Sequence, residues 1–326
     1  MPKANKGKLL LDATCAPADI KYPTDLNLLN EAREKLEGLI DESFARGEMG
    51  KLKPRMYRRK ARRDYLIAAK NKKISERKLK TAIRKQLQYL KRDLKYLEKA
   101  EQSKMGAKQR KDLAVIQRLY DQQKEMYDQQ IHSVENRIVS ISQDHVRPIV
   151  RGKAGAGVEF GAKISISVLN GFVFTDKISW SNYNEGTILK EQVLKYQQRF
   201  GCYPEAVVVD KIYRTRENQA FCRSFGIRLS GPALGRPRID EKERKKIKAQ
   251  EKKDISVRNE VEGSFGCGKR KYGLDLIMTK LPDTSETVIR INFLLMNIEK
   301  KLRFLLRLFF KWLTGQNNAI CFCAKF

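Results

Sequence analysis

The segment from Arg258 to Lys269 places an acid between two cations. At about 100° per residue, Arg258, Glu262 and Lys269 fall within about 40° of one another on a helix. Two further acids, Asp12 and Asp210, each end an apolar run. Three such carboxylates can hold two Mg²⁺ ions, because Mg²⁺ prefers oxygen ligands. These residue types therefore predict metal-dependent phosphodiester chemistry.

The chain is strongly basic. Its 326 residues include 68 Lys and Arg against 38 Asp and Glu, a formal charge of +30. Such an excess predicts a polyanionic partner, either nucleic acid or an acidic membrane surface. No stretch approaches the roughly 18 uncharged apolar residues that a membrane span needs. The most apolar region, 291–313, contains six charged residues and is typical of an amphipathic helix with a basic face. We therefore expect no membrane insertion.

Cysteine and histidine usage excludes several other chemistries. The six cysteines are scattered and lack paired CxxC spacing, which favours reduced thiols in a cytoplasmic protein. The N-terminal residues have no apolar signal-peptide core. With only two histidines, the sequence does not favour a zinc–histidine centre or a Ser-His-Asp triad. Carboxylates remain the catalytic candidates.

The first half of the chain alternates between one short apolar run and long basic helices. Residues 8–14 predict a buried strand ending near Asp12, and Thr24 predicts an N-cap for a helix through about Ala45. Residues 51–110 contain 23 Lys or Arg and 5 Asp or Glu. Within them, apolar residues at 79, 83, 87, 90, 94 and 97 predict a helix with a coiled-coil-like seam. We interpret this seam first as packing and second as a dimerisation surface, with a second, antiparallel helix at 107–133.

The pattern then changes from helical to strand periodicity. Residues 137–142 predict a strand, and 158–168 with 172–180 predict a hairpin around Asn170-Gly171. The remaining elements expected are helices at 187–200, 214–225, around Glu262 and at 285–313, with strands at 206–209 and 227–229. The acids thus fall on a first strand, at the end of a later strand and on a downstream helix. In the ribonuclease-H-like fold these three elements are neighbours.

We therefore predict an α/β fold: a ribonuclease-H-like mixed sheet flanked by helices, with a long basic helical insertion after the first strand. The expected organisation is residues 1–23 as the first strand of the catalytic core and 24–134 as the insertion. Residues 135–313 complete the core, and 314–326 form a disordered tail. The insertion is expected to contact DNA backbone without sequence preference, because its charge exceeds what solubility needs.

Several motifs resemble those of bacterial insertion-sequence DDE transposases, the group named after insertion sequences four and five. The resemblance is carried by Val207-Val-Val-Asp-Lys-Ile-Tyr213 and Ile227-Arg-Leu-Ser-Gly-Pro-Ala-Leu-Gly-Arg-Pro237, and by the segments 146–153 and 158–163. The group's Y-(2)-R-(3)-E-(6)-K signature is similar at Arg258, Glu262 and Lys269, with Ile255 at the tyrosine position. The resemblance covers roughly residues 8–23 and 135–300.

The resemblance implies Asp12, Asp210 and Glu262 as catalytic, metal-binding residues, holding two Mg²⁺ ions with Mn²⁺ as a substitute. It implies DNA phosphate contacts for Arg258 and Lys269. The implied activity is cleavage of DNA at element ends followed by 3′-hydroxyl strand transfer, by a nucleoid-associated bacterial homodimer. Members usually carry a helical N-terminal domain before the first acid, and this chain begins eleven residues before it. The alternative is a truncated, inactive remnant that only binds nucleic acid.

Other residues have both a functional and an ordinary interpretation. Lys211 and Tyr213 are expected to contact DNA, Tyr213 by stacking on a base, although a half-buried packing role is equally open for Tyr213 and for Trp180. Arg151 and Lys153 flank a glycine in a loop suited to phosphate contact. Asp19 and Asp144 compete with Asp12 for the first acid but are better interpreted as turn residues. A coiled-coil assembly protein and a simple metal-dependent nuclease remain rival functions.

Overall fold

A computed structural model describes residues 4–98, 105–153, 156–231 and 241–314, without the side chains of 151–153, 156 and 241–244. The chain forms two compact units, residues 1–19 with 149–326 and residues 20–148. We name them the sheet unit and the helical unit. The predicted tail from residue 315 onward and most of the segment 231–237 lie outside the described residues.

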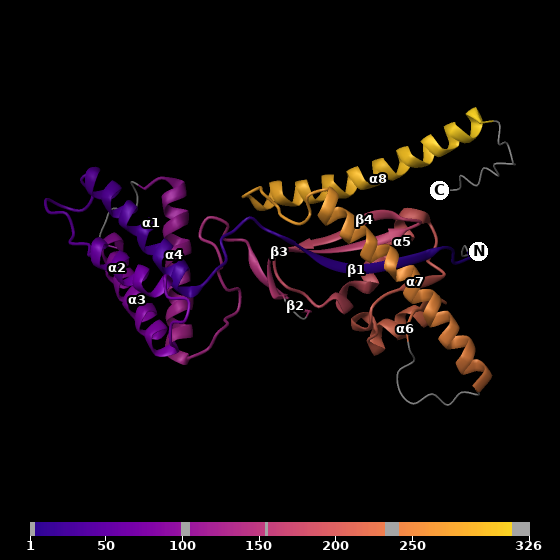
Figure 1. Cartoon of the computed structure of the whole chain (residues 1–326), viewed down its shortest axis with the longest axis horizontal. Helices are drawn as coiled ribbons and strands as arrows, with labels where there is room; N and C mark the ends of the chain where they lie inside the picture. Colours follow the sequence, from indigo (N-terminus) through magenta and orange to yellow (C-terminus); the bar gives the residue numbers. More distant parts are fainter. Residues whose placement is uncertain (1–3, 99–104, 154–155, 232–240, 315–326) are drawn as a thin grey trace. The chain divides into compact units, whose positions relative to one another are not determined.

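The sheet unit is built on a mixed, six-stranded sheet (Figure 1). Strand β1 (Lys8–Pro17) pairs antiparallel with β3 (Ala156–Leu169) and parallel with β5 (Ala206–Val208). Strand β6 (Arg228–Leu229) pairs parallel with β5. Strands β2 (Arg147–Lys153) and β4 (Phe172–Ser179) both adjoin β3. The order β2-β3-β1-β5-β6 thus places the predicted first strand at the centre of the sheet.

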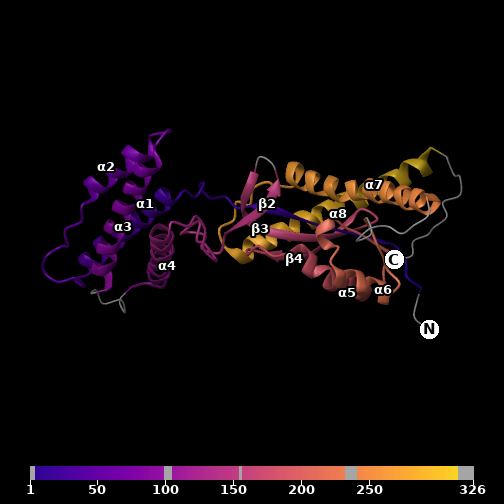
Figure 2. The same cartoon turned by 90° about the horizontal axis from the view of Figure 1, so that it is seen from below.

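Helices cover both faces of this sheet, as the two views show (Figure 1 and Figure 2). The sheet needs cover on both faces because successive apolar side chains of its central strands point to opposite sides. Leu10 and Val208 pack toward α7 (Glu241–Lys271) and α8 (Pro282–Leu313). Leu9, Leu11 and Val207 pack toward α5 (Leu189–Phe200) and α6 (Arg216–Ser224). A mixed sheet flanked by helices agrees with the predicted α/β class and is compatible with a ribonuclease-H-like fold.

Local turn chemistry produces the hairpin as predicted. Strands β3 and β4 pair from Leu169 with Phe172 onward, joined by Asn170 and Gly171. Both turn residues have positive φ, 49° and 73°, which is the backbone of a two-residue turn that favours Asn-Gly.

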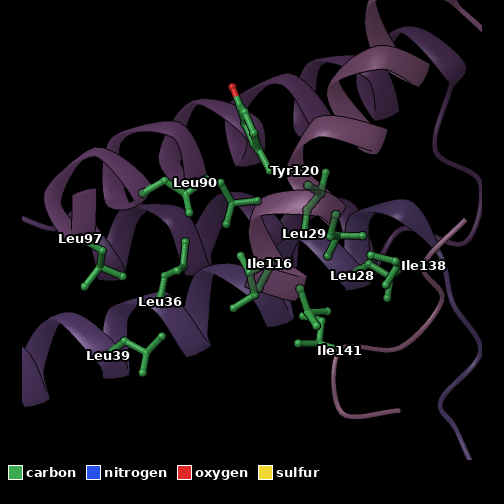
Figure 3. Close-up of a cluster of buried hydrophobic side chains, with 14 of the residues drawn as sticks. Leu28, Leu29, Leu36, Leu39, Leu90, Leu97, Ile116, Tyr120, Ile138 and Ile141 are labelled. Atoms are coloured by element: carbon green, nitrogen blue, oxygen red, sulfur yellow. The ribbon is translucent and has the colours of Figure 1, made fainter. Parts of the chain in front are cut away.

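The helical unit contains α1 (Asp25–Ala45), α2 (Arg58–Ala69), α3 (Glu76–Glu98) and α4 (Ala107–Gln129). The Thr24 hydroxyl accepts from the Asn27 amide at 3.3 Å, so the predicted N-cap is confirmed. The apolar seam of α3 packs inside this unit, because Leu87, Leu90, Leu94 and Leu97 are buried against α1 and α4. Figure 3 shows Leu90 and Leu97 in this cluster. These leucines are therefore not exposed to form the dimer interface that the sequence suggested.

The predicted strand at 137–142 is wrong. These residues form turns and irregular backbone, and Ile138 and Ile141 are buried in the core of the helical unit. Four consecutive side chains, from Ile138 to Ile141, are buried, so the apolar character of this segment reflects burial and not the alternation of a strand. Figure 3 shows Ile138 and Ile141 in this core. Among the described residues, none of the helices combines the length and the apolar character needed to cross a membrane.

Candidate active site

Strands β1 and β5 bring Asp12 and Asp210 to the same edge of the sheet. Their parallel register aligns Lys8 with Ala206 and Leu10 with Val208. Continuing this register by two residues sets Asp12 opposite Asp210, on the face that α7 covers, because side chains alternate between faces. Adjacent strands lie about 5 Å apart. Two acids separated by almost 200 residues of sequence therefore become neighbours.

Helix α7 adds the third acid and a cation. It is continuous from Glu241 to Lys271, so Arg258, Glu262 and Lys269 share one face as predicted. The Arg258 guanidinium donates to Asp210 Oδ1 at 3.1 Å and to Glu262 Oε1 at 3.2 Å. Arg258 thus links the acid at the end of β5 to the acid on α7.

These five residues line a single cavity of about 780 Å³, which we name the acidic cavity. Asp12, Asp210 and Glu262 form part of its wall together with Arg258 and Lys269. The competing acids lie elsewhere: Asp19 pairs with Lys280 at 2.8 Å, and Asp144 pairs with Lys111 in the helical unit. Neither lines the acidic cavity.

Asp12 is the most perturbed acid of the cavity. Burial is the main cause that raises its pKa from 3.8 to about 6, and the charges of Glu185 and Asp210 raise it further. The Ala13 amide, which donates to Asp12 Oδ1 at 2.8 Å, and the Arg258 charge lower it in part. The ionised form of Asp12 therefore needs more positive charge than the side chains around it supply.

The sequence did not indicate a fourth acid, Glu185, in the same wall. It begins the short 3-10 helix η2 (Glu185–Ile188), and its carboxylate pairs with Lys163 Nζ at 2.9 Å. Lys163 extends from β3, is almost fully buried, and also donates to the Tyr183 carbonyl at 2.8 Å. No spacing along the chain relates Glu185 or Lys163 to Asp12, so only the fold could place them there.

A buried asparagine fixes the turn that carries Glu185 against the turn that carries Asp210. Asn218 Nδ2 donates to the Gly186 carbonyl at 2.6 Å and to the Tyr213 carbonyl at 2.8 Å. Gly186 packs so closely that an added Cβ would lie 2.6 Å from the Ile212 carbonyl oxygen. The two acid-bearing turns are thus held in one fixed arrangement by backbone contacts.

The other predicted DNA contacts have different outcomes. Lys211 is exposed at the start of η3 (Lys211–Tyr213) and is accessible to a polyanion. Tyr213 is fully buried in the core between β5 and its covering helices, so its ring cannot stack on a base. Trp180 is half-buried against the opposite core. Arg151 and Lys153 belong to strand β2 and not to the predicted loop, and their side chains lie outside the described residues.

The donor set of the acidic cavity fits hard divalent cations, which take carboxylate oxygens. Four carboxylates line it, and burial and neighbouring negative charges disfavour ionisation of Asp12. As they stand, however, no three His, Cys, Asp or Glu side chains of the described residues converge closely enough to hold a metal. Arg258 lies between Asp210 and Glu262 instead.

The fold and this cavity define a class: an α/β domain with carboxylates gathered at the ends of adjacent parallel strands, on a strongly basic chain. Residues 207–299 match the family described as transposase DDE domain, which supports a DDE transposase. The matched segment includes Asp210, Arg258, Glu262 and Lys269, and Asp12 precedes it. Comparison with curated proteins and with solved structures gave no match.

Proposed function

We propose that this chain is a transposase of the insertion-sequence group named above, which cleaves DNA at element ends and joins the 3′-hydroxyl to target DNA. One observation carries the proposal: Asp12, Asp210 and Glu262, remote in sequence, line the same cavity beside Arg258 and Lys269. The family match at residues 207–299 supports the same chemistry.

Asp12, Asp210 and Glu262 would hold two Mg²⁺ ions, with Mn²⁺ as a substitute. Bound metals of this kind activate an attacking water or 3′-hydroxyl and stabilise the leaving oxygen. Arg258 neutralises Asp210 and Glu262 in the present arrangement, at 3.1 and 3.2 Å. Lys269 is half-buried in the same wall and supplies a further cation for a DNA phosphate.

Double-stranded DNA is the proposed partner, both as element ends and as target. The excess of 23 basic over 5 acidic residues at 51–110 belongs to the helical unit and supplies phosphate contacts without base readout. Lys211, Arg151 and Lys153 are proposed as further phosphate contacts of the sheet unit. Two copies acting together would engage the two ends of an element.

The test separates chemistry from binding. Asp210→Asn and Glu262→Gln should abolish Mg²⁺-dependent nicking of DNA carrying the element ends while leaving electrophoretic-shift binding intact. Glu260→Gln is the matched control: Glu260 lies on the same helix, is exposed, and does not line the acidic cavity. Undiminished nicking by either acid variant would refute the assignment of the acids.

The alternative, an inactive remnant that only binds nucleic acid, predicts a different experimental result. It requires that the wild-type chain show no cleavage with Mg²⁺ or Mn²⁺ while its DNA affinity still falls steeply with salt. Wild-type nicking at element ends would exclude it. Products joined to target DNA would further exclude a nuclease that uses water alone.

A further inference from the structure

Helix α8 has one face docked on the sheet unit and the opposite face uncovered. Ser285, Ile289 and Phe293 are buried against the core. Asn297 continues this face: its amide donates to the Val173 carbonyl at 2.7 Å and accepts from the Val173 amide at 2.8 Å. These contacts fix which side of α8 faces the sheet.

The uncovered face carries ten large apolar side chains between residues 291 and 313, each 46–66% exposed. They are Ile291, Leu294, Leu295, Ile298, Leu302, Leu305, Leu306, Phe309, Trp312 and Leu313. At about 100 Å² of exposed surface per side chain, the patch is roughly 1,000 Å². Soluble monomers seldom expose an apolar patch larger than about 600 Å². This surface therefore needs an occupant.

The spacing within the patch identifies what kind of occupant fits. Residues 291, 295, 298, 302, 305, 309 and 312 are all apolar and follow one another at intervals of four and three. We name these seven residues the α8 seam. A strict repeat of 3.5 residues keeps its side chains in line only when the helix supercoils around another helix. A lipid surface requires a broad apolar face but no such repeat.

We propose that the α8 seam pairs with the same seam of a second copy of this chain, forming a helical dimer interface. A second copy supplies an apolar repeat of identical length, and about 1,000 Å² per partner meets the roughly 800 Å² that a standard stable interface buries. The cations Arg303, Arg307 and Lys311 lie on the side away from the seam, so pairing leaves them in water.

The other regular apolar seam of this chain, on α3, cannot be the partner of the α8 seam. In α3 the corresponding leucines are buried by α1 and α4 of the same unit. Among the described residues from 301 to 314, every side chain is exposed except the partly covered Leu308. Substitutions in this part of α8 therefore alter the uncovered face without disturbing the core.

Two adjacent phenylalanines provide a matched pair of variants. Phe309 belongs to the α8 seam and is 51% exposed, whereas Phe310 is 56% exposed and lies about 100° away from it. Phe309→Lys should raise the dimer dissociation constant at least about a hundredfold, because each dimer loses two buried rings. Phe310→Lys adds the same charge and should change it less than about fivefold.

The measurement is light scattering coupled to size-exclusion chromatography of the full chain over a range of concentrations, with circular dichroism to verify helix content. A monomeric wild type would overturn the proposal, as would equal weakening by both variants. Binding to anionic vesicles by a monomeric wild type would indicate a lipid surface instead. Asp210→Asn should leave the dimer intact, so this inference and the proposed chemistry can fail separately.

Discussion

Replacing the most perturbed acid of the cavity should stabilise the protein while removing its proposed chemistry. In the metal-free protein the carboxylate of Asp12 is buried beside Glu185 and Asp210, and its pKa is raised from 3.8 to about 6. The charged form is therefore less favourable in the folded chain than in the unfolded chain. Asp12→Asn removes that charge and keeps an oxygen that can accept from the Ala13 amide.

The expected gain in the free energy of unfolding follows from the pKa shift of Asp12. The difference between about 6 and 3.8 corresponds to about 3 kcal/mol at about 1.4 kcal/mol per pKa unit. This net shift already includes the attraction of Arg258, so we expect Asp12→Asn to add up to about 3 kcal/mol to the free energy of unfolding at pH 8.

The sign of the pH dependence is set by the raised pKa. Above about pH 6 Asp12 is ionised in both the folded and the unfolded chain, so the folded chain bears the full free-energy cost of burying the charge. Between about pH 6 and 3.8 the folded chain alone takes up the proton, so the penalty shrinks as the pH falls. Below that window both states are neutral, and the advantage of Asp12→Asn disappears.

The assay is urea unfolding at pH 8 and pH 4 in the presence of a chelator, followed by tryptophan fluorescence. Both tryptophans, Trp180 and Trp312, belong to the sheet unit, so the signal reports the unit that contains the acidic cavity. Asp19→Asn is the control, because Asp19 pairs with Lys280 outside the cavity. Added Mg²⁺ should stabilise the wild type more than Asp12→Asn.

Two results would refute this reasoning. One is a variant that is no more stable than the wild type at pH 8, which would mean that the environment of Asp12 does not disfavour its charge. The other is a stabilisation equal at pH 8 and pH 4, which would assign the gain to packing instead of ionisation.

Three further predictions concern the elements that hold the cavity. Asn218→Ala should cost about 2–3 kcal/mol in urea unfolding, because two buried carbonyls lose their donor. Gly263→Ala should stabilise α7 by up to about 1 kcal/mol, since its added methyl meets open space, whereas Gly268→Ala should destabilise it through a 2.7 Å contact. Hydrogen bonds from Arg228 hold the pKa of Asp254 below its usual value despite burial. Asp254→Ala should therefore cost about 1–2 kcal/mol at pH 7, a loss that fades as the pH falls below about 4.

Local signals account for the parts of the fold that the sequence predicted well. The Asn170-Gly171 turn and the Thr24 cap depend on the chemistry of adjacent residues, and both are confirmed. The face shared by Arg258 and Glu262 required only that α7 be a continuous helix. Such features are readable because their causes lie within a few residues of one another.

Features set by tertiary packing were missed or misread. Glu185 enters the cavity because η2 packs on η3, a contact between segments that no periodicity connects. For Tyr213 the sequence left base stacking and packing equally open, and the turn directs its ring into the core. The segment 137–142 is rich in apolar residues because irregular backbone here buries consecutive side chains, from Ile138 to Ile141, without forming a strand.

The apolar seams of α3 and α8 show that a sequence repeat does not identify the partner of a helix. A repeat of four and three predicts that a helix will face another helix, but it does not say which one. In α3 the partner is supplied by the same unit, and the leucines from 87 to 97 are buried. In α8 the repeat is equally regular and its side chains remain about half exposed. Because both seams obey one pattern, only the burial of each can assign packing to α3 and association to α8.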